Sequence, residues 1–268
     1  MRISGLILAF TCLSTSAAAQ EAAEGSSEKP EGRTEVTVQA ASSYVTGEVN
    51  GQEYDTALVS AGIVMRSGRL FLGASIPYVV TSAPEEFIVS GGGLLGTPLF
   101  SQPSSETREV TRDGIGDMVV EAGYSLPLGS FDATIAGNVK IPTASRDKAL
   151  GSGELDYGVG AQVSRRLGEF VPFASANYTV LGKPDGFDVQ NTLSGSAGSH
   201  YILGRSTSAT LSYVYEESAV KSIADRQSIG LGLDTSVSRQ ISLGLNASAG
   251  LSKDAPDARV GLRLSLGL

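Results

Sequence analysis

The sequence predicts an all-β protein, a single up-and-down antiparallel β-barrel of about twelve strands that spans a membrane. Three observations lead to this fold class. Apolar residues alternate with small or polar residues along most of the chain, short and long connections follow one another, and 33 glycines accompany a hydrophobic share of 41% with no tryptophan. Because successive strand side chains point to opposite faces, such alternation indicates strands with one apolar face.

The end of the chain shows the alternation most clearly. Residues 260–268 read VGLRLSLGL, so that one valine and four leucines share one face while glycine, arginine and serine share the other. A strand of this kind needs a protein core or lipid to cover its apolar face. We expect lipid, and the rest of the fold prediction builds on this segment.

The first 19 residues have the features of a secretory signal peptide. Arg2 precedes an apolar run and a small-residue tract, and cleavage is expected after Ala19. Cys12 is the only cysteine, and Thr11 before it does not fit a lipid-anchoring site. The mature chain would then have no cysteine, which excludes disulfides and thiolate chemistry.

Two further segments follow the signal peptide. Residues 20–34 are acidic, carry Ser, Gly and Pro and have no period, so we expect a flexible periplasmic lead. The barrel is expected to occupy residues 35–268. No run of about 18 apolar residues occurs there, as a spanning helix would need, whereas a barrel strand crosses with about 9–11 alternating residues.

The first three strands are expected at residues 36–44, 54–65 and 70–78, where the period of two is unbroken. Asn50-Gly51 predicts a tight hairpin turn between the first two. The tetrapeptide 66–69, Arg-Ser-Gly-Arg, predicts the next turn.

The alternation then stops over residues 81–113, which are expected to form a long outer loop. Structureless loops of more than about 12–15 residues are usually functional or mobile. The loop holds a glycine-rich tract that lacks the Lys and the following helix of a phosphate-binding loop. We therefore expect a lid or an inward plug formed by Gly91, Gly92, Gly93, Leu94 and Leu95.

Nine more strands with the same alternation follow. They are expected at residues 118–126, 131–141, 155–163, 174–180, 193–201, 209–215, 229–237, 241–251 and 260–268. Short connections alternate with long ones between them, as tight periplasmic turns alternate with longer outer loops in an up-and-down barrel. An even number of strands places both termini in the periplasm.

A soluble β-sandwich also alternates, so the period alone leaves both folds open. The position of the aromatic residues favours the barrel, because two interfacial girdles are expected at the strand ends. Such residues are Tyr124, Phe131 and Tyr201 at the short-turn end and Tyr44, Tyr78, Tyr157, Tyr178, Tyr213 and Tyr215 at the long-loop end. The opposite face is Gly, Ser, Thr, Asn or Gln with scattered charges, which suits a wet lumen and would make a poor sandwich core.

The two ends of the expected barrel differ in charge. The short turns carry Arg66, Arg69, Arg165, Arg166, Arg205 and Arg239 against the single acid Glu169, whereas the long loops hold most carboxylates. We expect these loops to face outward, in contact with outer-membrane lipid and lipopolysaccharide. Their carboxylates either bridge divalent cations, which prefer oxygen ligands, or form a solvated acidic rim.

Seven charged residues are predicted to face the lumen. They are Glu121, Asp132, Lys140, Asp156, Asp234, Arg259 and Arg263. Rings of charge can tune the selectivity of a pore. Alternatively, these residues pair with one another and fill the narrow interior of a barrel of this size, and the sequence does not decide between the two.

His200 is the only histidine, so it cannot belong to a multi-histidine metal site. A Ser-His-acid triad would have to use it. Ser196 on the same strand lies about 13 Å away, whereas Ser208 or Thr210 could approach from the next strand. We expect a lumen histidine, with an outer-membrane hydrolase or acyltransferase as the alternative, and no metal, cofactor or nucleic acid.

Three motifs point to a known family. They are GIGD at 114–117, VKIPT at 139–143 and GSGELDYG at 151–158. From about residue 114 onward the chain resembles the outer-membrane transporter family named for the MetA pathway of phenol degradation. The resemblance implies a barrel that passes hydrophobic or aromatic compounds, and it carries over no catalytic residues.

The expected protein is thus not an enzyme but a passive channel for small-molecule solutes. It would be inserted by the barrel-assembly machinery into the outer membrane of a Gram-negative bacterium. A non-conducting structural or surface-interaction barrel is the alternative.

Overall fold

The computed structural model describes residues 34–85, 87–89, 98–100, 108–184 and 186–268. Its secondary structure within these ranges consists of strands, and no helix there could span a membrane. The signal peptide predicted at 1–19, the lead up to residue 33 and the predicted lid residues Gly91, Gly92, Gly93, Leu94 and Leu95 lie outside the described residues.

The described residues form fifteen strands. They are β1 (Thr34–Val49), β2 (Gln52–Ser67), β3 (Leu70–Pro84), β4 (Ile88–Val89), β5 (Pro98–Phe100), β6 (Glu109–Ile115), β7 (Met118–Leu128), β8 (Phe131–Ile141), β9 (Asp156–Ser164), β10 (Phe170–Val180), β11 (Thr192–Ile202), β12 (Thr207–Glu216), β13 (Arg226–Ser236), β14 (Ile241–Gly250) and β15 (Ala258–Gly267).

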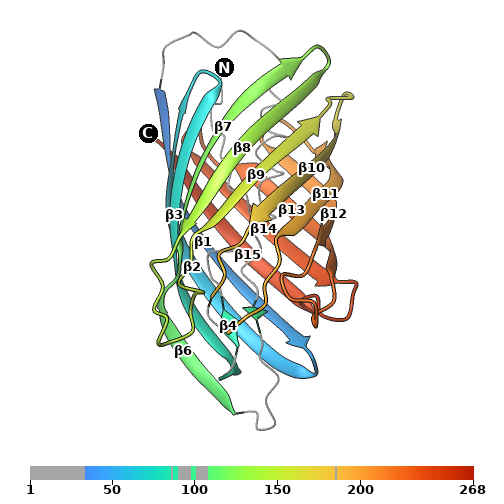
Figure 1. Cartoon of the computed structure of the whole chain (residues 1–268). Coiled ribbons are helices and arrows are strands. Elements are labelled where there is room, and N and C mark those ends of the chain that lie inside the picture. The colour runs from blue at the N-terminus through green and yellow to red at the C-terminus, as the bar shows by residue number, and fades with distance from the viewer. Residues whose placement is uncertain (1–33, 86, 90–97, 101–107, 185) are drawn as a thin grey trace.

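Twelve of these strands close into an antiparallel barrel (Figure 1). The ring closes where β1 pairs with β15, with Thr37 opposite Gly267 and Thr46 opposite Ala258. β7 lies between β3 and β8, and β6 is an additional strand that continues the line of β7 along β3. β4 and β5 form a separate two-stranded ladder. The predicted fold class, an antiparallel barrel of about twelve strands, is confirmed.

The break between β6 and β7 is a one-residue bulge. Ile115 and Val119 are four positions apart, whereas their partners on β3, Tyr78 and Ser75, are three apart. The N–H of Gly116 donates to the Pro77 carbonyl at 2.8 Å. Because a bulge bends its strand and redirects a side chain, Asp117 turns into the barrel and is fully buried.

The barrel wall is not equally tall all round. β1, β2 and β3 have 16, 16 and 15 residues, whereas β9 to β15 have 9 to 11. The three long strands β1 to β3, together with β6, extend past the other strands at the long-loop end, which is the lower end of Figure 1. The predicted long loop is correspondingly shorter than 81–113, because β3 continues to Pro84 and β6 begins at Glu109.

Large apolar side chains cover the outside of the barrel. In the last three strands the exposed ones are Ile229, Leu231, Leu233, Ile241, Leu243, Leu245, Val260, Leu262, Leu264 and Leu266. A soluble protein rarely exposes so continuous an apolar surface, so this belt faces lipid. The segment 260–268 therefore has the orientation expected from its alternation.

Tyrosines mark the boundary of this belt at the long-loop end, as predicted. Tyr44 donates a hydrogen bond to Asp55 at 2.6 Å, and Tyr78 donates one to Asp113. Both rings are exposed on the outer face while the hydroxyl reaches a carboxylate, the usual arrangement at a membrane–water interface.

The predicted turns are correct at one hairpin and displaced at another. Asn50 and Gly51 have φ of 54° and 82°, as a tight hairpin turn requires. Arg66, predicted in the second turn, instead belongs to β2 and is 5% exposed on the inner face, with its guanidinium 5.5 Å from the centre of the Phe71 ring. The turn itself consists of Gly68 and Arg69.

Candidate functional site

The inner face of the barrel has a polar part and an apolar part. The strands from β11 to β15 turn mostly Ser, Thr, Gly and Asn inward, as predicted. β1 to β3 instead bury Val45, Leu58, Val64, Phe71 and Val79 on that face. The expectation of a uniformly small and polar inner face is therefore wrong for the first three strands, which bury large apolar side chains there beside threonines.

Much of the apolar part gathers at the long-loop end, in a group that we call the mouth cluster. It comprises Val45, Val49, Tyr54, Leu58, Val79, Ala83, Phe87, Leu150 and Ile223, with Ala144 and Val220 packed against it. The inner faces of the tall strands β1 to β3 meet side chains from the segments after β3, β8 and β12. A second, smaller cluster, Val189 and Ala219 with Ile88, Leu181, Phe187 and Val220, packs beside it.

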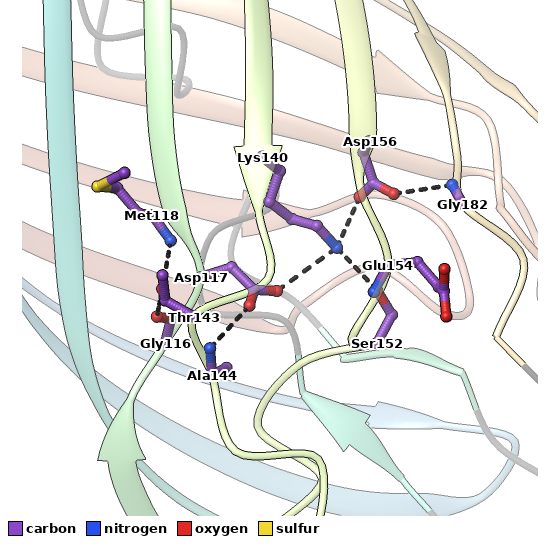
Figure 2. Close-up of polar contacts among 10 residues, drawn as sticks. All are labelled: Gly116, Asp117, Met118, Lys140, Thr143, Ala144, Ser152, Glu154, Asp156 and Gly182. Carbon is purple, nitrogen blue, oxygen red and sulfur yellow. Dashed lines mark hydrogen bonds and ion pairs between the residues drawn. The ribbon is translucent and has the colours of Figure 1, made fainter.

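A buried group of charges lies near the mouth cluster, and we call it the Lys140 cluster (Figure 2). Lys140 Nζ lies 2.7 Å from Asp156 Oδ2 and 3.4 Å from Asp117 Oδ2, and it donates a hydrogen bond to Ser152 Oγ at 2.9 Å. All four side chains are buried. Burial raises the pKa of the Asp117 carboxyl, so its ionised form depends on Lys140 and on the Ala144 N–H that it accepts.

Two other ion pairs lie on the inner face. Arg226 Nη2 is 2.6 Å from Glu216 Oε1, and Arg263 pairs with Asp234. In each pair the two opposite charges compensate each other, because a buried charge without its partner would be strongly destabilising.

The seven predicted lumen charges can now be placed. Lys140 pairs with Asp156, and Arg263 with Asp234, so the pairing alternative describes these four. Glu121 is buried beside Gly73. Asp132 has an inward register but is exposed next to the short turn, and Arg259 is half-buried between Val45 and Ser248. A role in selectivity remains a prediction for all seven.

Inward glycines allow long side chains to lie flat against the wall. A Cβ at Gly123 would meet the Phe71 ring, and one at Gly158 would lie 2.7 Å from the amide of Asn138. In each case the side chain comes from a neighbouring strand. The absent side chain of Gly158 thus makes room for Asn138.

His200 is fully buried on the inner face. Its ring stacks on Phe173 at 4.7 Å, and its Nδ1 lies 2.8 Å from the Thr210 hydroxyl, so the expected approach of Thr210 is confirmed. A hydrolytic triad needs a carboxylate on one ring nitrogen and a serine on the other. Among the described residues Nδ1 contacts Thr210 and Nε2 has no hydrogen-bond partner, so the geometry is that of a packed lumen histidine.

Several residues of the site were not predicted. Asp117 stood within the GIGD motif, and the signal that could have singled it out is a lone acid between two strand segments. Leu150, Phe87 and Ile223 lie in connections without a period, so no sequence pattern assigns them to a buried cluster.

A closed barrel with an apolar outside and a polar, charge-bearing inside defines a membrane-spanning β-barrel protein. The chain belongs to the family described as "Putative MetA-pathway of phenol degradation", which it matches over residues 29–268. The match extends the predicted resemblance from residue 114 to nearly the whole chain. No curated protein sequence matches the chain.

Solved structures are similar to the chain, and the first of those named here shares its fold. The COG4313 outer membrane channel from Pseudomonas putida F1 has 14% identity and a TM-score of 0.63, over 90% of this chain and 97% of that one. The KdgM porin has 7% identity and a TM-score of 0.49, covering 86% and 98% of the two chains. The CymD monoaromatic hydrocarbon channel has 11% identity and a TM-score of 0.46, covering 88% of each.

Proposed function

We propose that the protein is a passive outer-membrane channel for small apolar or aromatic molecules. The observation that carries the proposal is the mouth cluster, an apolar group at one end of a lumen that is otherwise largely polar. An apolar solute can replace the contacts that these side chains make with one another, whereas a polar solute would lose its water there. The fold shared with an outer membrane channel supports the same proposal.

Uptake by whole cells tests this function. Lipopolysaccharide slows the entry of apolar compounds, so expression of the protein should raise the initial uptake of a labelled monoaromatic hydrocarbon. Ile223→Asp places a charge in the mouth cluster and should abolish the gain, because Ile223 is buried there. Lys221→Asp puts the same side chain at an exposed position of the same connection and should keep it.

Two outcomes would contradict the proposal. Uptake could be the same with and without the protein, or Lys221→Asp could lower it as much as Ile223→Asp. A non-conducting barrel is the second candidate, and the pairing of the lumen charges favours it. It predicts no conductance above background when the purified protein is placed in planar bilayers.

The surroundings of the channel belong to the same proposal. The long loops would face the outside and contact lipopolysaccharide, and both ends of the chain would lie in the periplasm. The described residues contain no group of three or more His, Cys, Asp or Glu that could hold a metal. Export by a cleaved signal peptide and insertion by the barrel-assembly machinery complete the expected route.

A further inference from the structure

The connection between β8 and β9 folds back over the mouth of the barrel. Residues 142–155 include Leu150, which is fully buried in the mouth cluster although neighbouring Asp147 and Lys148 are exposed. Its Cδ1 would lie 3.0 Å from a Cβ at Gly114, so it packs directly against the strand β6. Leu150 therefore packs between the mouth cluster and β6.

Both limbs of this connection are held by the Lys140 cluster (Figure 2). On one limb the Ala144 N–H donates to Asp117 Oδ1 at 3.1 Å. On the other, Ser152, two residues after Leu150, accepts a hydrogen bond from Lys140 Nζ at 2.9 Å. Leu150 thus lies between two points that are fixed to one buried group of charges.

The space for this arrangement depends on a residue without a side chain. A Cβ at Gly151 would lie 2.7 and 2.8 Å from the two Asp117 carboxylate oxygens and 2.8 Å from the Ala144 Cβ. The connection can therefore approach Asp117 only because position 151 is glycine.

The same cluster also holds a second connection. Asp156 accepts the Gly182 N–H at 2.9 Å through Oδ1, while its Oδ2 binds Lys140. Gly182 follows Leu181, which packs in the smaller apolar cluster beside the mouth. One ammonium group thus links the connections after β8 and β10 to the bulge before β7.

We propose that the Lys140 cluster is a latch that positions Leu150 as the stopper of the mouth. This inference rests on the proposed function, since it names the residues that control entry into the same lumen. Loss of Lys140 leaves two buried carboxylates facing each other, so the connection 142–155 swings outward and uncovers the mouth cluster. Lys140 acts here as a positioning residue and does not itself need to touch the solute.

Thiol labelling measures the position of Leu150 without any solute transport. Cys12, the only cysteine, lies in the predicted signal peptide and is replaced by serine in the test protein. Leu150→Cys then provides a single thiol, and its reaction with a membrane-impermeant maleimide reports its exposure. In the unlatched variant Lys140→Met the reaction should be faster by about tenfold or more, since one charge-assisted hydrogen bond has this effect on an equilibrium.

Two matched controls belong to the experiment. Asp147→Cys, an exposed position of the same connection, should react rapidly whether or not Lys140 is present. Glu154→Gln breaks the exposed ion pair with Arg146, also within this connection, and should change the Leu150→Cys rate by no more than about twofold, because such pairs contribute little.

A milder variant keeps the test decisive if Lys140→Met does not give the heat-resistant, folded band on gels. Ser152→Ala removes only the hydroxyl that joins the connection to Lys140, and it should still accelerate labelling by several-fold. Two results would overturn the latch. In the protein with Lys140 intact, Leu150→Cys could be labelled as fast as Asp147→Cys, or its labelling rate could stay the same in both Lys140→Met and Ser152→Ala. A failure of solute uptake with accelerated labelling would instead count against the channel alone.

Discussion

Several inward glycines leave room for a side chain from the strand beside them. Gly198 is an example with backbone atoms among its close neighbours. A Cβ there would run into the Leu211 carbonyl oxygen and would lie 2.8 Å from Phe173 Cζ and 2.9 Å from Ser212 Cα. The Phe173 ring, which also stacks on His200, could rotate away, but the backbone of β12 could not.

Gly198→Ala should therefore lower the free energy of unfolding by about 2–3 kcal/mol, the upper range for overpacking. Guanidinium unfolding in detergent, followed by circular dichroism, measures the change. Gly232→Ala is the matched control, since a Cβ there would lie 3.4 Å from Thr210 Cβ in ordinary contact. Equal stability of the two variants would contradict this packing.

Single residues also show what the sequence could and could not predict about the site. Lys140 and Asp156 were predicted to face inward because they stand at alternate positions of well-patterned strands. Asp117 and Leu150 lie outside such patterns, and a bulge and a folded-back connection bring them into the site. Local alternation carries no information about either feature.

At the scale of the strand, the side chains of β13 point alternately to the lipid and to the lumen. Leu231 is 63% exposed in the middle of its outer face, while the glycines on either side of it turn inward. Leu231→Arg should destabilise the barrel by about 2–4 kcal/mol, because a charge at the bilayer midplane has to leave water. Unfolding from lipid vesicles provides the measurement.

The same substitution at the end of the next strand tests whether depth is the cause. Leu251 follows β14 at the long-loop end and is 59% exposed, nearly as much as Leu231. Near the interface Leu251→Arg should lower stability by only about 0–1 kcal/mol. A similar loss at both positions would mean that the belt on β13 is not buried in lipid.

The strands themselves were the most predictable level of structure. All twelve expected ranges contain a strand of the barrel, because each has a period of two and ends at a turn signal. β6 was missed, since its residues, EVTRDGI, carry charges on a segment that extends beyond the membrane. A strand outside the bilayer does not need an apolar face.

At the scale of the whole molecule, the closure of the ring and the assembly of the mouth depend on contacts between distant segments. Thr37 pairs with Gly267, and the mouth cluster brings Val45 together with Leu150 and Ile223. Barrel closure could be inferred from the even number of strands and the lipid-facing belt. The mouth cluster could not be inferred from the sequence, because its loop residues fit the space between the strands and follow no repeating pattern.

The orientation of the molecule in the membrane leads to the last prediction. The short turns carry Arg69, Arg165, Arg166, Arg205 and Arg239, whereas the long connections carry most of the acids. Short turns lie in the periplasm and long loops outside in barrels of this architecture. In intact cells a membrane-impermeant maleimide should therefore label Asp147→Cys, between β8 and β9, and leave Arg239→Cys, between β13 and β14, unlabelled.

Permeabilising the outer membrane should then make Arg239→Cys react as well, which controls for the reactivity of that thiol. Both positions are exposed, so burial cannot explain a difference between them in intact cells. Labelling of Arg239→Cys alone would mean that the barrel is inserted the other way round. The mouth cluster and the Lys140 cluster would then face the periplasm. Leu150 would in that case control the release of solutes from the barrel into the periplasm rather than their entry from outside the cell.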